Sequence, residues 1–213
     1  MNLPKPLILV LSLLTSNVSS AAVFTNASDF FANAGTLNVE SFETLPVTNL
    51  FDSSTLSLPG FEMTTTAAMG VFSGLPGNGT HPTDGDTFVH HFLSGRESFT
   101  VTFTFVNAIT AFGLTTTDWV ELPTSGADLY TMTTSAGDHL SISGFPELEN
   151  GAEIFSGIVN SAGFTSVSLS GPQQGDAFGI DGVYYSPVPL PSAAWLLGSA
   201  LIGLMGVARR KKA

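Results

Sequence analysis

The sequence predicts an all-β protein: an antiparallel, jelly-roll-like sandwich with one short N-terminal helix, followed by a C-terminal transmembrane helix. Three observations predict the sandwich. Apolar and hydroxyl side chains alternate strictly from Ser98 to Phe105, which is the period of a strand with one buried face. Short runs of this kind recur between clusters of Gly, Pro, Asn and Asp. The chain has 17 Phe and no Cys, so aromatic packing must build its core without disulfides.

The first 22 residues predict a secretory signal peptide. One positive charge, Lys5, precedes an apolar run from Leu7 to Leu14, and small residues follow at Ser19–Ala21. This order is that of a cleavable export signal, with cleavage near Ala21 or Ala22. The apolar run is too short to span a bilayer by itself.

Residues 23–187 form the predicted sandwich body, which has the size of one domain. The one helical candidate is Thr25–Gly35, where Asn26 or Ser28 could cap the start and Gly35 could end the helix. Besides Ser98–Phe105, strands are expected at Leu37–Phe42, Leu58–Thr64, Ala67–Phe72, Thr87–Phe92, Ile109–Leu114, Leu129–Thr134, His139–Ser143, Ile154–Val159, Ser166–Ser170 and Phe178–Tyr185.

Charge is distributed very unevenly along the chain. All 17 acidic residues lie between Asp29 and Asp181, a stretch whose single Lys or Arg is Arg96. A body with this balance repels phosphate backbones, which excludes nucleic acid as a partner.

The C-terminal residues 188–213 predict a membrane anchor. Ser192–Ala208 is uncharged and mostly apolar, at the short limit for a spanning helix, and Arg209–Lys212 is basic. The positive-inside rule keeps these charges in the cytoplasm and leaves the body outside.

This tail resembles the sorting signal of PEP-CTERM proteins, which has a Pro-x-Pro motif, one apolar helix and a basic end. The matching residues are Val188, Pro189, Leu190, Pro191, Arg209 and Arg210, with Leu190 where the family usually has Glu. The resemblance implies processing by an exosortase, a membrane-embedded protease. It also implies export to the inner membrane and then to the cell surface or the exopolysaccharide matrix of a Gram-negative bacterium.

Patches of the body, such as "FTNASDFFANAG", "ESFETLP" and "FGIDGVYY", are also similar to secreted PEP-CTERM proteins. The resemblance implies a jelly roll related to carbohydrate-binding modules, in which Glu43 and Asp181 would hold a structural Ca²⁺. An acidic body without disulfides would gain from such an ion. The alternative is that both are solvated acids at strand ends.

Other candidate residues point to chemistry less directly. Trp119, beside Asp118, could stack on a sugar ring, or it could belong to the core. The segment Thr83–Thr87 has oxygen ligands spaced like the opening of a calcium loop, although a turn is the simpler interpretation. His90 and His91 are adjacent on a predicted strand, so their side chains should point to opposite faces and not share a metal.

The sequence therefore predicts an exported surface or matrix protein whose body binds polysaccharide without catalysis. One alternative is a secreted carbohydrate-active enzyme, and another is an adhesin anchored by its tail. The enzyme would use a carboxylate pair drawn from Asp118, Glu121, Asp128, Glu147, Glu149 and Glu153.

Overall fold

The computed structural model describes residues 21–48, 53–74, 79–93, 98–118, 128–143, 151–172 and 177–187. The predicted signal peptide before residue 21 and the predicted sorting signal, 188–213, lie outside these ranges. Within them, no helix has the length and apolar character needed to cross a membrane.

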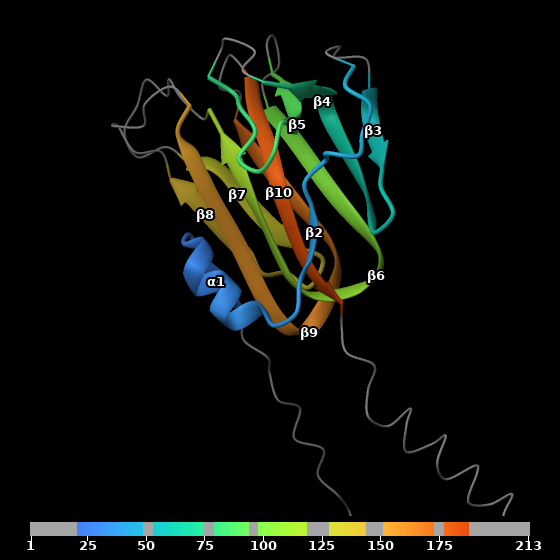
Figure 1. Cartoon of the computed structure of the whole chain (residues 1–213). Coiled ribbons are helices and arrows are strands. Elements are labelled where there is room, and N and C mark those ends of the chain that lie inside the picture. Colours follow the sequence, from blue (N-terminus) through green and yellow to red (C-terminus); the bar gives the residue numbers. More distant parts are fainter. Residues whose placement is uncertain are drawn as a thin grey trace, which may run out of the picture.

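The described chain is mostly β-strand with one short helix, as the sequence predicts (Figure 1). In chain order the elements are β1 (Ala22–Phe24), α1 (Ala27–Ala34), β2 (Asn38–Glu40), β3 (Ser53–Ser57), β4 (Phe61–Ser73), β5 (Thr87–Phe92), β6 (Ser98–Thr117), β7 (Asp128–Thr134), β8 (His139–Ser143), β9 (Glu153–Pro172) and β10 (Ala177–Pro187).

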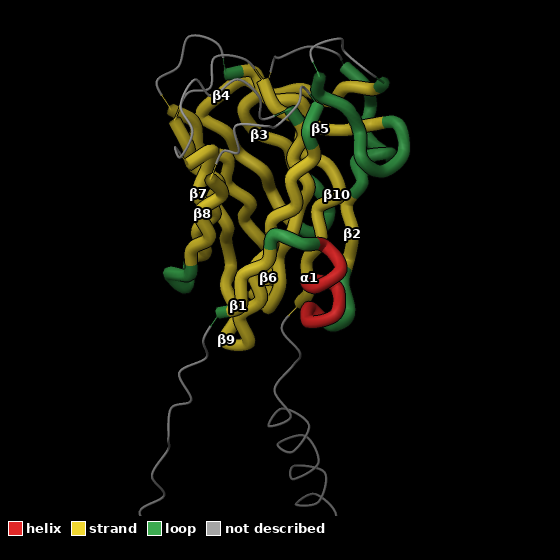
Figure 2. Tube along the Cα trace, turned by 90° about the vertical axis from the view of Figure 1, so that its left-hand side faces the viewer, coloured by secondary structure: helices red, strands yellow, loops and turns green. Residues whose placement is uncertain are grey.

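The strands form two packed layers, and all their pairings are antiparallel (Figures 1 and 2). In the first layer, here the β10 layer, β10 pairs with the second half of β6 on one side and with β5 and β2 on the other. In the second layer, the β7 layer, the order is β3, β4, β6, β9, β7 and β8. The pairings β4–β5–β10–β6–β4 close on themselves, so the two layers are one continuous sheet.

The long strands β6 and β9 belong to both layers. They pair from Thr117–Glu153 at one end to Ser98–Pro172 at the other, with register shifts around Ile109. At these shifts the pair folds over at the lower end of the molecule, next to the exposed corner residue Val106. β4 likewise pairs with β6 through its first half and with β5 through its second half.

The strands predicted from the sequence are wrong here, because β4, β6 and β9 are each one continuous strand and not two short ones. In β6, the consecutive residues Val106 and Asn107 are both exposed. In β9, the same is true of Ser161 and Ala162. A bend that exposes consecutive side chains interrupts the period of two in the same way as a turn does. Two short strands, β1 and β3, were also not expected.

Helix α1 begins and ends where the sequence predicts. Asn26 is the N-cap, its side-chain oxygen accepts from Asp29 N at 3.2 Å, and Gly35 follows the last turn with a φ of 74°. Phe30 is fully buried against β6 and β9. A Cβ at Gly157 would lie 2.6 Å from the Phe30 ring, so the glycine admits the helix to the sheet.

The main core lies between the layers and is built largely from Phe. Phe61, Phe103, Phe105 and Phe112 form a chain of rings with centroid separations of 5.0–5.8 Å, in tilted and edge-to-face geometries that aromatic pairs favour. The apolar side chains that alternate in Ser98–Phe105, which are Phe99, Val101, Phe103 and Phe105, all belong to this core, which confirms the strand predicted there.

The two ends of the sandwich differ. Ala22 pairs with Val159 and Pro187 with Ile109, so the described chain starts and stops at the lower end of the molecule (Figures 1 and 2). Thr117 and Glu153 pair at the opposite, upper end of the first half of β9, away from the register shifts around Ile109. Asp118 and Asp181 lie near the same end, because Asp118 directly follows β6 and Asp181 pairs with Thr115, two residues before the end of that strand.

Candidate functional site

Glu43 is positioned by a strained turn after β2. Phe42 has a φ of 61°, which is unusual for a residue with a side chain, and its ring is fully buried in the main core. The Glu40 carboxylate accepts a hydrogen bond from Phe42 N at 2.8 Å. Core packing and this bond together hold the turn and aim the next side chain, Glu43, at the segment Thr83–Thr87.

Asp181 reaches the same segment from β10. It is 1% exposed, and its Oδ2 accepts from Thr83 N at 2.7 Å, from Asp84 N at 2.8 Å and from Thr83 Oγ1 at 3.3 Å. Its Oδ1 accepts from Gly182 N at 2.7 Å. Burial raises the pKa of Asp181 above its ordinary value, against the opposite effect of these donors.

Glu43 binds the other end of the segment. Its Oε1 accepts from Asp86 N at 2.9 Å and from Thr87 N at 2.7 Å. Between the two acids stands Gly85, with a φ of 75°, and a Cβ there would lie 2.5 Å from Glu43 Cδ. We call Thr83–Thr87 with these two carboxylates the clamped loop. The loop needs glycine both for its backbone conformation and for the approach of Glu43.

The predicted calcium ligands are thus brought to one loop, although their partners are backbone amides. Oδ2 of Asp181 accepts three hydrogen bonds, whereas Oδ1 accepts one, from Gly182 N. Among the residues that the structure describes, no group of three His, Cys, Asp or Glu side chains is arranged to hold a metal ion. The calcium site predicted from Glu43 and Asp181 therefore stays a prediction.

Asp118 ends β6 in a left-handed conformation, with a φ of 65°. Its side chain is 6% exposed, and its Oδ1 accepts from Gly151 N at 3.1 Å. Its own amide donates to Ala152 O at 3.1 Å. Asp118 therefore ties the end of β6 to the start of β9. Its predicted partner in sugar binding, Trp119, lies outside the described residues.

His81 joins the same corner, and sequence reasoning did not place it there. Its Nδ1 lies 2.9 Å from Gly79 O and its Nε2 lies 3.1 Å from Glu153 Oε1. Because both neighbours are acceptors, the contacts suit a protonated imidazole. Burial lowers the pKa of His81, but the Gly79 carbonyl, Glu153 and Asp118 raise it more, so the pKa lies above its ordinary value. The sequence indicates Glu153 only as one of the acids that a carbohydrate-active enzyme could use.

A groove of about 570 Å³ opens beside this corner, between β8 and the start of β9. Its polar lining comes from Thr25, Ser141, Ser143 and Glu153. Its apolar lining comes from Ile142, Ile154 and Phe155. The volume lies within the range of roughly 300–1,000 Å³ that is typical of ligand sites, which also combine apolar walls with a few polar groups. The groove is therefore a candidate binding site.

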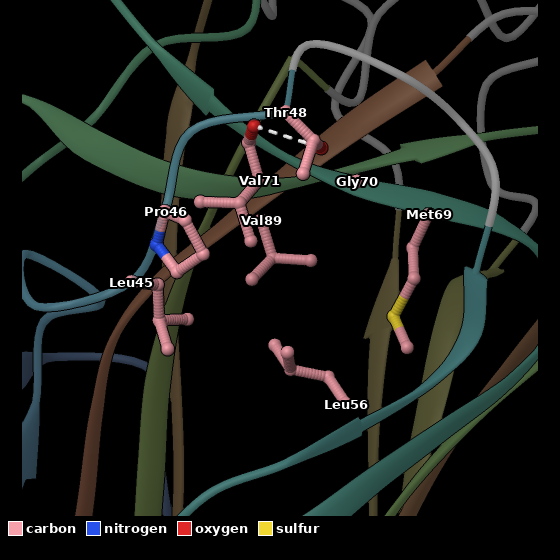
Figure 3. Close-up of a pocket in the computed structure, with 8 residues that line it drawn as sticks. All are labelled: Leu45, Pro46, Thr48, Leu56, Met69, Gly70, Val71 and Val89. Carbon is pink, nitrogen blue, oxygen red and sulfur yellow. Dashed lines mark hydrogen bonds between the residues drawn. The ribbon is translucent and has the colours of Figure 1, made fainter.

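A second cavity, of about 130 Å³, is almost wholly apolar (Figure 3). Leu45 and Pro46 face Leu56, Met69 and Val89 across it, and Thr48 N donates to Val71 O at 2.9 Å along its rim. The polar side chain in its lining is that of Thr48, whose hydroxyl donates to Val71 O at 3.5 Å.

His90 and His91 lie on opposite faces of β5, as predicted. The His91 ring stacks on Phe178 at a centroid distance of 4.7 Å, whereas the His90 ring contacts Phe72 and Phe88. Burial lowers the pKa of His90 to about 4. Burial and the neighbouring His90 lower the pKa of His91 to about 3. Both side chains are therefore neutral packing elements at ordinary pH.

No family model matches the chain, and no curated protein matches it. Several solved structures are distantly similar to the chain. The K2 cleaved adhesin domain of Lys-gingipain is 13% identical, with a TM-score of 0.47, over 71% of this chain and 99% of that one. The K1 cleaved adhesin domain of Lys-gingipain from Porphyromonas gingivalis W83 is 13% identical, with a TM-score of 0.43, over 72% and 99%. The structure of TmCBM61 in complex with β-1,4-galactotriose is 18% identical, with a TM-score of 0.34, over 70% and 99%.

Proposed function

We propose that the protein is an exported, non-catalytic glycan-binding module with a jelly-roll-related body. The observation that carries this proposal is the groove between β8 and β9. Its hydroxyl groups and its carboxylate can hydrogen-bond to sugar hydroxyls, while Phe155 and the two isoleucines offer apolar surface to the sugar rings. Among the described pairings β8 has one strand neighbour, β7, so the groove also runs along a sheet edge.

Of the six acids named for the enzyme alternative, the structure describes the side chains of Asp118 and Glu153, and both already have partners. Asp118 is buried and bound to Gly151 N, and Glu153 is paired with His81. A glycosidase needs two carboxyl groups that both face the scissile bond. Hydrolysis of polysaccharides by the purified protein would be the direct evidence for the enzyme instead.

The groove can be tested by blocking it. We expect the full chain, purified in a neutral detergent, to be retarded in gels that contain its polysaccharide, and Ser143→Trp to abolish the retardation. Ser57→Trp is the matched control, because Ser57 is also the exposed last residue of a five-residue edge strand, β3, at the other side of the β7 layer. Equal retardation of both variants would place the ligand elsewhere, and no retardation by any polysaccharide would refute glycan binding.

The proposal for the cellular location rests on the two ends of the sequence. The segment Val188–Pro191, the apolar run and the basic cluster support sorting by an exosortase-type protease, with a membrane-held intermediate before release to the surface or matrix. We expect deletion of residues 188–213 to move the protein from the membrane fraction to the soluble periplasmic or extracellular fraction. An unchanged distribution after fractionation would refute this route.

A further inference from the structure

We propose that a separate pocket, at the lower end of the molecule, binds one uncharged sugar unit. The pocket has a volume of about 230 Å³ and shares no described lining residue with the groove between β8 and β9. It lies between Asn38 and Tyr185 of the β10 layer on one side and Pro59, Gly60 and the corner of β6 at Val106 on the other. We call it the corner pocket. Its volume is below the range of roughly 300–1,000 Å³ that is typical of drug-sized ligands, so it suits a single sugar ring and not a chain.

The Tyr185 ring lines the corner pocket, and packing fixes its position. The ring contacts Phe61 edge-to-face at a centroid distance of 5.7 Å and Phe105 at 5.4 Å. Gly60 admits the hydroxyl end of the ring, because a Cβ at Gly60 would overlap the Tyr185 oxygen. An aromatic side chain that its neighbours already hold loses little freedom when a ligand binds, and it offers both apolar surface and a polar tip.

Three of the lining residues carry an uncharged polar group, namely the Tyr185 hydroxyl and the side-chain amides of Asn38 and Asn107. Both asparagines are exposed and Tyr185 is half-buried, and none of these three groups has a hydrogen-bond partner among the described residues. Burial and, to a smaller extent, the nearby Glu40 raise the pKa of Tyr185, so its hydroxyl keeps its proton and can donate. Each amide offers both donors and an acceptor, so the three groups together can donate to and accept from sugar hydroxyls.

The remaining lining residues favour a ligand that is neutral and partly apolar. Pro59 and Val106 add apolar surface, and Val106 is 81% exposed at the bend of β6. No residue with a charged side chain belongs to the described lining. A charged sugar would therefore lose hydration there without gaining an ion pair, whereas a wholly apolar ligand would leave the three polar groups without partners. A neutral sugar ring meets both requirements, because it presents C–H groups as well as hydroxyls.

The corner pocket and the groove lie at opposite ends of the sandwich. Ile109, which lines the corner pocket, pairs with Pro187 at the lower end, whereas Glu153 of the groove pairs with Thr117 at the upper end. A substitution that blocks one site therefore leaves the other unchanged, and the two can be tested independently. If the groove binds glycan as proposed above, one body with both sites can join two polysaccharide chains.

The test measures binding of single sugars to the full chain by saturation-transfer NMR, in a neutral detergent without a sugar headgroup. The probes are the methyl glycosides of glucose, galactose and mannose, with glucuronic acid and glucosamine as charged counterparts. We expect at least one neutral glycoside to bind, and the charged sugars to bind more weakly than it does.

Tyr185→Phe should weaken binding of that glycoside about tenfold, because it removes the hydroxyl and keeps the ring packing. Tyr184→Phe is the matched control, since the neighbouring tyrosine packs against Phe31 of α1 on the other face of β10, and it should leave binding unchanged. Asn107→Ala tests the same pocket at an exposed position and should also weaken binding. Its control is Asn33→Ala, at an exposed position on α1.

The outcomes separate the corner pocket from the groove. Binding that persists in Ser143→Trp and is lost in Tyr185→Phe assigns the sugar to the corner pocket, whether or not the groove retards the protein in polysaccharide gels. If no neutral glycoside binds, or if Tyr185→Phe and Tyr184→Phe bind equally, the corner pocket is not a sugar site. If a charged sugar binds as tightly as the neutral glycoside, or if glycerol displaces the glycoside at equal concentration, the pocket does not select a neutral sugar ring and the inference is wrong.

Discussion

Glu43 and Asp181 bind the two ends of the same five-residue loop. Glu43 Oε1 accepts from the amides of Asp86 and Thr87, and Asp181 Oδ2 accepts from those of Thr83 and Asp84. One acid follows an early strand and the other lies on the last strand. The clamped loop therefore connects the beginning and the end of the fold through charge-assisted hydrogen bonds to amide groups.

Replacing Asp181 should destabilise the fold. In Asp181→Asn, one carboxylate oxygen becomes an NH₂ group, which cannot accept hydrogen bonds from the backbone amides around it. We expect the unfolding free energy to fall by about 2–3 kcal/mol. Urea denaturation followed by circular dichroism measures this change. Asp86→Asn is the control, because Asp86 is exposed and contributes its backbone alone to the clamp; it should change stability by less than about 0.5 kcal/mol. Equal effects of the two variants would show that the Asp181 contacts do not stabilise the loop.

Gly85→Ala should separate Glu43 from the clamped loop. The added Cβ meets Glu43 Cδ at 2.5 Å, and the φ of 75° disfavours any residue with a side chain. We expect a loss of about 1–2 kcal/mol together with faster amide hydrogen exchange at Asp86 and Thr87. Gly137→Ala provides a control for strain alone, since Gly137 has a φ of 91° but a Cβ there would meet nothing within 4 Å. Unchanged exchange at Asp86 and Thr87 would contradict the role of Glu43.

Chelation decides the calcium prediction. Because amide groups already bind both carboxylates, we expect EDTA to leave the melting temperature of the full chain unchanged at low ionic strength. Differential scanning fluorimetry with and without added Ca²⁺ is sufficient. If EDTA lowers the melting temperature, added Ca²⁺ restores it, and Asp181→Asn shows neither effect, the site that the sequence predicts would be confirmed.

Acid should destabilise the body through its buried histidines. The folded-state pKa of His90 is about 4 and that of His91 is about 3, both below the ordinary value of 6.5. The unfolded chain therefore binds more protons between pH 6.5 and these values, and stability must fall as the pH falls through this window.

His91→Phe tests this pH dependence. Both ring nitrogens of His91 are buried without a hydrogen bond in the described structure, and the ring stacks on Phe178. A phenylalanine keeps the stack and removes the unsatisfied polar atoms, so we expect a gain of about 1–2 kcal/mol at pH 7 and a lower pH midpoint of acid unfolding. His139→Phe, at an exposed position, should leave the acid midpoint unchanged. If His91→Phe unfolds at the same pH as the unmodified chain, protonation of His91 does not drive acid unfolding.

The secondary structure could be predicted wherever a local pattern determined it. Asn26 and Gly35 gave the limits of α1, and the alternation in Ser98–Phe105 gave the first half of β6, because capping and one-sided burial act over a few residues. The continuity of β6 past Val106 depends on pairing with β9, more than 40 residues further along the chain, and no local signal carries it.

The site was predictable in its acids but not in their partners. The resemblance to carbohydrate-binding jelly rolls predicts that Glu43 and Asp181 lie close together. Their hydrogen-bond donors come from Thr83–Thr87, a segment that the sequence indicates only as a turn. His81 was missed because its contacts with Gly79 O and Glu153 depend on the packing of a loop against the start of β9. His81 and Glu153 are 72 residues apart in the sequence, so no local period or spacing indicates that they are in contact.

The placement of Pro187 at the lower end, opposite the groove, determines how the body would carry mechanical load. β10 runs the length of its layer, with β6 hydrogen-bonded on one side and β5 and β2 on the other. A force that pulls on Pro187 while a ligand holds the upper end acts parallel to β10. It therefore loads the hydrogen bonds between β10 and its neighbouring strands in shear, all at the same time, instead of breaking them one by one. Such a strand resists extraction until many bonds fail at once, and the lifetime of the tethered body under tension would then be set by its unfolding rate.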